Sequence, residues 1–330
     1  MEVTRGHVVE SIHRGDIAVV NYKGDLLYYA GDPYKYTYFR SAAKPIQAMQ
    51  VILSSAYETF RLDHKELAVM CASHFGEKMH RSTVEGILDK IGLKKEHILG
   101  GTVSSLNPEI ALTQAYDQLT LNPLFSDCSG KHAGFLSVCV KKNYDISNYM
   151  KPDHPLQREI LATISKICQY PQENIALGID GCSVPVHAMP LFNMALGYAR
   201  LGNPVMLDSI DNKAAQDIFI AMNRFPEMVA GTGGFCSDLI RHTNQKLIGK
   251  IGAEGIYCIA LKEKGLGIAV KIEDGNMQRL PAVVMDIFRQ LSVLTDKEKN
   301  SLSQYQNMKI TNDLGQNTGQ IRPVFKLSKA

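Results

Sequence analysis

Ser41 and Lys44, three positions apart, are the first residues in this sequence whose types could do chemistry together. If Ser41 caps a helix that begins here, Lys44 lies one turn further along on the same face, within reach of the hydroxyl. A lysine serves as base for a serine nucleophile only when it is neutral. Burial, the positive end of the helix and the neighbouring Arg40 would each lower the pKa of Lys44. A plain N-cap serine with a solvated lysine fits the same pattern.

A second serine, Ser73, follows the apolar run 67–71, which we expect to be a strand. A serine at the carboxyl end of a strand is well placed to meet a substrate. It is equally well explained as a turn residue before the helix that starts near Glu77. Far along the chain, Lys250 lies late in another predicted strand, where it either faces a pocket or is solvated.

Two loop segments, 127–134 and 178–185, contain candidate metal ligands. The thiolates of Cys128 and Cys182 could bind a soft divalent metal such as zinc, but two cysteines are only half of a site. The residues that would complete it are Lys131, His132 or Asp180. The alternative is a pair of small buried cysteines.

A glycine-rich segment at 230–235 resembles a phosphate-binding loop at first sight. It lacks the trailing Gly-Lys-Ser/Thr and follows no clear strand, so a tight loop lining a pocket fits equally well.

The composition indicates a globular protein. The chain has 330 residues, of which 45% are hydrophobic and 21% charged, and its net charge is +3. These values exclude disorder, collagen and coiled coil, and they predict no nucleic-acid or membrane partner. The N-terminus has no apolar core of a signal peptide, and no apolar run is long enough for a membrane span. Seven cysteines, an odd count, suggest reduced thiols in the cytoplasm.

Strands at both ends of the chain and helices between them must position these residues. Alternation predicts strands over 7–13, 16–22, 26–30, 246–251, 256–261 and 266–272. Apolar periodicity predicts helices from Ser41 onward and over 77–91, 131–140, 153–169, 187–202, 211–225 and 280–294, before a polar tail. We therefore expect an α+β or mixed α/β fold, with a central antiparallel sheet built from the two termini. The expected single domain has a sheet lobe, 1–40 plus 230–330, and a mostly helical lobe, 41–229.

Taken together, six segments resemble the serine-lysine L-asparaginases of the rhizobial, thermolabile type, the asparaginase II family. They are RSAAKPIQA (40–48), CASHFGE (71–77), DCSGKHAGF (127–135), GIDGCSVP (178–185), AGTGGF (230–235) and KIGAEG (250–255). They occur in the family's order and span roughly residues 5 to 295. The resemblance implies a fold similar to serine β-lactamases, penicillin-binding proteins and serine-dependent glutaminases, and a homodimer.

The resemblance also implies an activity, the hydrolysis of L-asparagine to L-aspartate and ammonia. Its implied catalytic residues are two Ser–Lys pairs, Ser41 with Lys44 and Ser73 with Lys250. Lys246 is a second candidate for the lysine that pairs with Ser73. Its implied zinc ligands are Cys128, Lys131 and Cys182, and its implied substrate-pocket residues are Arg40, His132 and Asp180.

We expect Ser41 to be the nucleophile, because its lysine is local, with Ser73 and Lys250 relaying protons; the opposite assignment stays open. Zinc would orient the amino-acid head of the substrate rather than drive the reaction. The alternatives are a glutaminase or β-lactam hydrolase of the same fold, and a non-catalytic amino-acid-binding protein. Two complete Ser–Lys pairs argue against the last.

Overall fold

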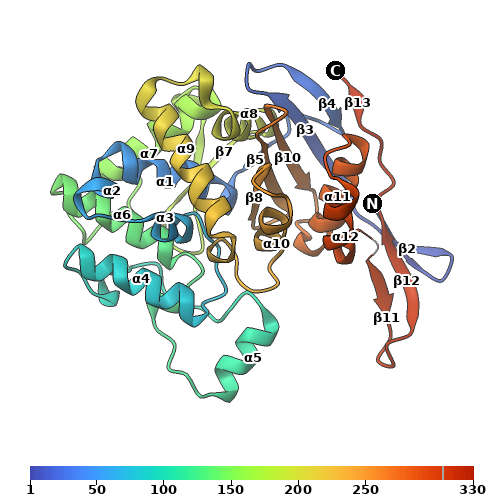
Figure 1. The fold of residues 1–330 in the computed structure, drawn as a ribbon, viewed down its shortest axis with the longest axis horizontal. Coiled ribbons are helices and arrows are strands. Elements are labelled where there is room, and N and C mark those ends of the chain that lie inside the picture. Colours follow the sequence, from blue (N-terminus) through green and yellow to red (C-terminus); the bar gives the residue numbers. More distant parts are fainter. Residues whose placement is uncertain (307) are drawn as a thin grey trace.

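A six-stranded antiparallel sheet lies at the centre of the fold (Figure 1). The computed structural model describes residues 1–306 and 308–330. The strand order is β13-β4-β3-β10-β9-β8. The bounds of these strands are β3 Gly15–Asn21, β4 Leu26–Ala30, β8 Leu247–Gly252, β9 Ile256–Leu261, β10 Leu266–Ile272 and β13 Ser328–Lys329. The sheet therefore joins residues 15–30 directly to the last third of the chain, as expected from the sequence. The strand predicted over 7–13 belongs instead to a separate sheet.

Helices surround this sheet and form most of the middle of the chain (Figure 1). The longer ones are α1 Lys44–Leu53, α3 His64–Met70, α4 Lys78–Lys90, α5 Pro108–Tyr116, α6 Ser129–Lys142, α7 Pro155–Cys168, α8 Leu191–Gly202, α9 Ser209–Arg224, α10 Phe235–His242 and α11 Leu280–Gln290. The short ones are α2 Ala56–Thr59 and α12 Asp296–Ser301. Within the described ranges, no helix is both long and apolar enough to cross a membrane.

Both faces of the central sheet are covered. Every residue of β9 is buried, and successive side chains of a strand point to opposite faces. Helix α8 packs along β3, β9 and β10. Gly267 of β10 permits this contact, because a Cβ at this position would lie 1.8 Å from the carbonyl oxygen of Ala195 in α8.

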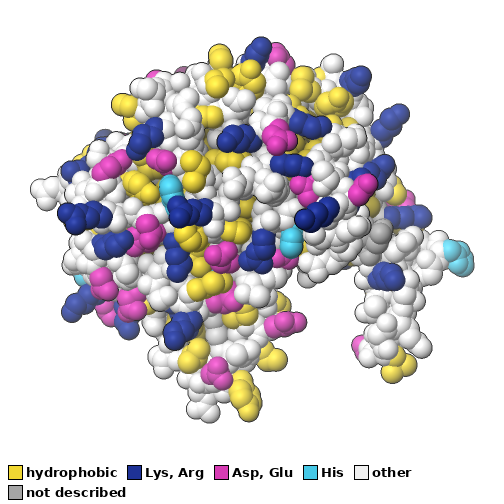
Figure 2. Space-filling view, in the orientation of Figure 1, with side chains coloured by type: hydrophobic (Ala, Val, Ile, Leu, Met, Phe, Trp, Pro, Cys, Tyr) yellow, Lys and Arg dark blue, Asp and Glu magenta, His cyan; other side chains and the backbone are white. Residues whose placement is uncertain are grey.

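Two smaller sheets flank the central one. One is an arm in the order β11-β12-β1-β2, which projects from the body of the molecule (Figures 1 and 2). Its strands are β1 Glu2–Arg5, β2 Val8–Ile12, β11 Lys309–Thr311 and β12 Asn317–Arg322. The other has the order β5-β7-β6, and its strands are β5 Tyr36–Tyr38, β6 Ala176–Ile179 and β7 Pro185–Pro190. The turn between β6 and β7 contains Asp180 and Cys182.

The structure confirms the mixed fold with a terminal-strand sheet and corrects several local predictions. The run 67–71, predicted as a strand, lies in helix α3. Ser41 does not cap α1; it lies in a 3₁₀ turn, Arg40–Ala43, and Ala43 is the N-cap. The helix predicted over 187–202 begins at Leu191, because the preceding residues form β7. Described residues of the polar tail add strands to two sheets: β11 and β12 to the sheet of β1, and β13 to the central sheet.

Candidate active site

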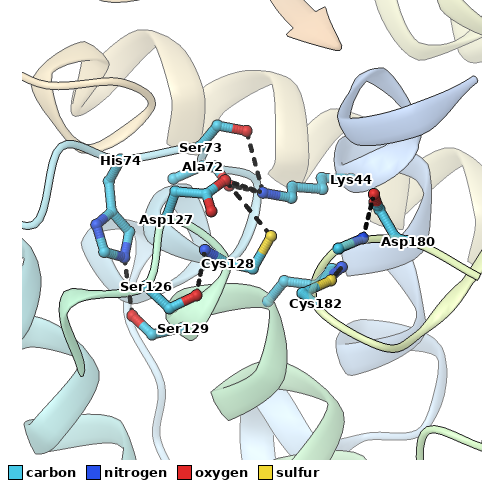
Figure 3. Close-up of polar contacts among 12 residues, drawn as sticks. Lys44, Ala72, Ser73, His74, Ser126, Asp127, Cys128, Ser129, Asp180 and Cys182 are labelled. Carbon is cyan, nitrogen blue, oxygen red and sulfur yellow. Dashed lines mark hydrogen bonds and ion pairs between the residues drawn. The ribbon is translucent and has the colours of Figure 1, made fainter. Parts of the chain in front are cut away.

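Ser73 lies between two lysine ammonium groups. Lys44, the first residue of α1, points its Nζ at Ser73 Oγ over 3.0 Å and at the Ala72 carbonyl oxygen over 2.6 Å (Figure 3). Lys250, in β8, donates to the same Ser73 Oγ over 2.8 Å and to the Ile251 carbonyl oxygen over 2.7 Å. Both lysines are buried. The alternative candidate, Lys246, pairs instead with Glu298 over 2.9 Å.

The surroundings of the two lysines shift their pKa values in opposite directions. Burial, and to a smaller extent the nearby positive charge of Lys44, together lower the pKa of Lys250 to about 8. Burial also disfavours the Lys44 ammonium, but the negative charges of the Cys128–Cys182 pair and of Asp127 outweigh burial and raise its pKa. Of the two, Lys250 therefore reaches the neutral state more easily.

Arg40 and Ser41 lie in the 3₁₀ turn directly before Lys44 and are more exposed than Ser73. Both are half-buried, whereas only 5% of Ser73 is exposed. Arg40 has a φ of +48°, a sparsely populated conformation that costs about 1–3 kcal/mol and persists where the surroundings enforce it. Its guanidinium donates to Asp180 Oδ1 over 2.9 and 3.2 Å. The ion pair thereby brings the turn that contains Asp180 next to the residue that precedes Ser41.

The expected local pair of Ser41 with Lys44 is not hydrogen-bonded. In the parts of the chain that the structure describes, Lys44 Nζ bonds to Ala72, Ser73 and Asp127 rather than to Ser41. The reason is that Lys44 is the first residue of α1, so its side chain leaves the helix toward the Ser73 loop instead of lying above a capping serine.

The two predicted metal-ligating cysteines also come together. Cys128 is the N-cap of α6, and Lys131 follows in the first turn, with its Nζ 2.9 Å from Cys182 Sγ. A hydrogen bond from Cys128, together with the Lys131 charge, lowers the pKa of Cys182 far below its ordinary value despite burial. The same bond, and burial, raise the pKa of Cys128. The Cys182 thiolate is thus stabilised by both the Cys128 thiol and the Lys131 ammonium group.

Side chains of the usual metal-binding types do not by themselves form a site here. Among residues 1–306 and 308–330, no group of three or more His, Cys, Asp or Glu side chains could hold a metal ion. The cluster does contain two sulfurs and the Lys131 amine. The adjacent His132 Nε2 is buried and has no hydrogen-bond partner among the described residues. This donor set fits a soft divalent metal if Lys131 is deprotonated.

His132 lies deeper than a substrate-contacting residue is expected to lie. It is fully buried, its Nδ1 is 2.6 Å from the Tyr149 hydroxyl, and its ring packs against Gly100. Burial lowers the pKa of His132. Its position next to the Cys182 thiolate indicates a supporting role.

Sequence reasoning missed two residues that contact the predicted ones. The carboxylate of Asp127 lies 3.5 Å from both Lys44 Nζ and Cys128 Sγ (Figure 3). His74 hydrogen-bonds the Ser129 hydroxyl beside Cys128. Both residues belong to motifs that stood out in the sequence, and their proximity to Ser73 and Cys128 along the chain was the available signal.

Comparison with known proteins gives the class of this chain. The profile of the L-asparaginase II family matches residues 1–323. The chain therefore belongs to the L-asparaginase II family, and its class is that of the amidohydrolases. No curated protein matches the sequence.

Solved structures with a related outline are distant in sequence. A β-lactamase from Mycobacterium bovis has 13% identity and a TM-score of 0.42, over 85% of this chain and 95% of that one. A putative β-lactamase from Bacteroides dorei has 12% identity and a TM-score of 0.45, over 84% and 93%. Mglu in its native form has 14% identity and a TM-score of 0.48, over 84% and 61%.

Proposed function

We propose that this protein hydrolyses L-asparagine to L-aspartate and ammonia through a serine activated by lysine. Family membership supports the reaction class, and one observation supports the mechanism: Lys44 and Lys250 both hydrogen-bond Ser73 Oγ. The 3₁₀ turn that contains Ser41 packs against β8, the strand of Lys250. A Ser–Lys cluster needs no histidine, because a lysine with a lowered pKa can take the proton of the nucleophile.

Ser41 is the nucleophile in this proposal, since it is half-buried while Ser73 is almost inaccessible. Its base is Lys44, which must first lose a proton. Ser73 provides the route, because its hydroxyl can accept a proton from Lys44 and pass its own to neutral Lys250. This exchange leaves Lys44 neutral and Lys250 charged; because the pKa of Lys44 is the higher one, only a small fraction of the protein is in this reactive state at equilibrium. The proton relay explains why two lysines surround one buried hydroxyl.

The chemical steps then balance with these groups alone. Ser41 Oγ attacks the side-chain amide carbon, and its proton goes to Lys44. Lys44 returns the proton to the departing nitrogen, the C–N bond breaks, and ammonia leaves a Ser41 ester. Water deprotonated by the same lysine hydrolyses this ester, releasing aspartate and restoring the serine hydroxyl.

The Arg40–Asp180 ion pair is the proposed recognition element for the amino-acid head. Its side chains are 24% and 10% exposed, and Arg40 is the residue directly before Ser41. A guanidinium binds a carboxylate, and a carboxylate binds an ammonium group, so the pair has a partner for each end of a small zwitterion. This supports asparagine over a β-lactam, and a substrate panel separates asparagine from glutamine.

Zinc is proposed as a bound cofactor, with Cys128, Cys182 and Lys131 as its ligands. When bound, it would supply a positive charge that helps to orient a substrate carboxylate or carbonyl. Metal analysis of the purified protein and of Cys128→Ala tests this assignment, with the fully buried Cys258→Ala as control. Equal zinc content in all three proteins would remove Cys128 from the ligand set.

A homodimer, a cytoplasmic location and the division into two lobes remain predictions from the sequence. Light scattering on the purified protein tests the homodimer.

Ammonia release from L-asparagine and L-glutamine by wild type, Ser41→Ala and Ser73→Ala tests the activity. Ser82→Ala is the matched control, because Ser82 is an exposed serine of α4. Mass spectrometry after rapid quenching should find the aspartyl ester on Ser41 in wild type. An ester on Ser73 would reverse the assignment of the two serines, and no hydrolysis by folded wild type would refute the function.

A further inference from the structure

His74, the residue after the buried serine, links the two chain segments that hold Lys44. Ser73 points toward Lys44, whereas His74 points away from it and is fully buried (Figure 3). The neighbouring segment is the turn at Asp127–Ser129, which precedes and begins α6. The amide of His74 donates to the Asp127 carbonyl oxygen over 3.2 Å. Its ring reaches Ser129 Oγ over 2.8 Å.

The hydrogen bonds around His74 fix where its proton lies. The Gly76 amide donates to His74 Nδ1 over 3.1 Å, so Nδ1 is the acceptor and Nε2 bears the hydrogen. Nε2–H then donates to Ser129 Oγ, whose own hydroxyl donates to the Leu124 carbonyl oxygen over 3.2 Å. Each polar atom in this chain has one defined role, and a fully satisfied buried network is rigid.

A second imidazole ring, that of His80, stacks against the ring of His74. His80 stacks on His74 with ring centroids 4.8 Å apart and planes within 9° of parallel. His80 is itself fixed by a hydrogen bond to the Glu227 carbonyl oxygen over 3.0 Å. The His74 ring therefore cannot turn to find another partner without leaving this stack.

The two segments joined by His74 are the ones that supply the acceptors of Lys44. Ala72 and Ser73 come from one segment and Asp127 from the other. A change in the separation of these segments would therefore alter the position of the Lys44 ammonium. We propose that His74 is a positioning residue that holds the Ser73 loop against the Asp127–Ser129 turn and thereby keeps Lys44 and Ser73 in reacting geometry. This inference rests on the proposed function, in which Lys44 and Ser73 exchange a proton.

Two substitutions distinguish the roles of the two ring nitrogens of His74. His74→Asn keeps an acceptor near Nδ1 for Gly76 but is too short to reach Ser129. His74→Gln places an amide nitrogen near the position of Nε2 and keeps the bond to Ser129. Ser129→Ala removes the same bond from the other side. For asparagine hydrolysis, we expect His74→Asn and Ser129→Ala to lower kcat about 10- to 100-fold with little change in KM, since small misplacements have such effects.

The remaining variants show whether the loss comes from that bond. The double variant His74→Asn with Ser129→Ala should be no slower than either single variant, because both remove one interaction. His74→Gln should recover most of the lost kcat. The matched control is His154→Asn at the start of α7. His154 is also buried, accepts from the amide two residues ahead and bonds a remote oxygen, the Asp145 carbonyl.

Several outcomes would overturn the inference. One is a kcat for His74→Asn equal to that of His154→Asn at a temperature where both are folded. Another is additive losses in the double variant. If wild type hydrolyses no asparagine, the proposed function fails instead, and a crystal structure of His74→Asn then decides. A Lys44 Nζ that keeps its Ala72, Ser73 and Asp127 partners at unchanged distances would refute the positioning role.

Discussion

Lys44 and Lys250 bind the same oxygen atom, with their Nζ atoms 3.0 and 2.8 Å from Ser73 Oγ. One lysine comes from the start of α1 and the other from β8, so the fold brings together residues from the first and last thirds of the chain. Two ammonium groups this close disfavour each other. Asp127 stabilises the charge on Lys44, and no ion pair is found for Lys250 among the described residues. Of the two lysines, Lys250 is therefore the one that loses its proton more readily.

This asymmetry predicts how activity depends on Lys250 and on pH. Lys250→Met should lower kcat/KM by about 100-fold or more, because a proton acceptor is lost. Lys250→Arg should be equally impaired, since a guanidinium does not give up its proton. Wild-type kcat/KM should fall as the pH drops through about 8, the pKa to which burial lowers Lys250. Lys246→Met is the control, and an active Lys250→Arg enzyme would contradict the prediction.

The same buried amine should weaken the fold at neutral pH. Its pKa is about 8 in the folded protein, below the value of about 10.4 for an unfolded lysine. Between these values the unfolded chain binds more protons, so the free energy of unfolding rises with pH across this window. Lys250→Met should therefore be more stable than wild type at pH 7, by about 1–2 kcal/mol.

Urea unfolding at pH 7 and pH 10 measures this difference. The advantage of Lys250→Met should shrink at the higher pH, where wild type no longer has to bury a charge. Lys246→Met tests whether any loss of a lysine has the same effect, since Lys246 keeps an ion pair with Glu298. A variant that is less stable than wild type at both pH values would show that the hydrogen bonds of Lys250 matter more than its burial.

Local patterns predicted much of the fold. The hairpin of β9 and β10 and the helices α4, α6, α7 and α9 lie where alternation and periodicity put them. The run 67–71 was misassigned because a short apolar run does not distinguish a buried strand from a buried helix. The missed signal was Asp63 followed by Glu66, a capping box that marks the start of α3.

The site was harder to predict, because its contacts are between distant residues. Sequence spacing suggested that Lys44 would face Ser41, yet its long side chain reaches Ser73 in another loop. The pairing of Lys250 with Ser73 came from a family resemblance, since nothing in local sequence tells which strand lies beside that loop. The bond from His74 to Ser129 left no trace in spacing or periodicity.

The Arg40–Asp180 pair should control substrate affinity more than turnover. Asp180→Asn keeps the shape of the side chain but removes its charge, and we expect KM for asparagine to rise about tenfold with a smaller change in kcat. Steady-state kinetics with asparagine checks this. Glu10→Gln is the control, because the Arg5–Glu10 pair has side chains that are 58% and 46% exposed and such pairs contribute little. An unchanged KM in Asp180→Asn would exclude the pair from substrate recognition.

Gly100 packs closely against the His132 ring and should not tolerate a larger residue. A Cβ at this position would lie 2.7 Å from His132 Nε2 and 3.0 Å from its Cε1. The ring cannot retreat easily, because it is fully buried and bonded to the Tyr149 hydroxyl. Gly100→Ala should therefore destabilise the fold by about 1–3 kcal/mol, the usual cost of overpacking. It should also shift the ring relative to its neighbour Lys131 and so disturb the Cys182 cluster.

Gly86, in α4, provides the matched comparison. A Cβ at Gly86 would meet no atom within 4 Å, so Gly86→Ala should stabilise the protein by about 0.5–1 kcal/mol through helix propensity. Thermal unfolding of the two variants and wild type shows in one experiment whether each substitution raises or lowers the stability. If Gly100→Ala is as stable as wild type while Gly86→Ala behaves as expected, the His132 ring has room to move. That result would refute the prediction that His132, and through it Lys131, has a rigid environment.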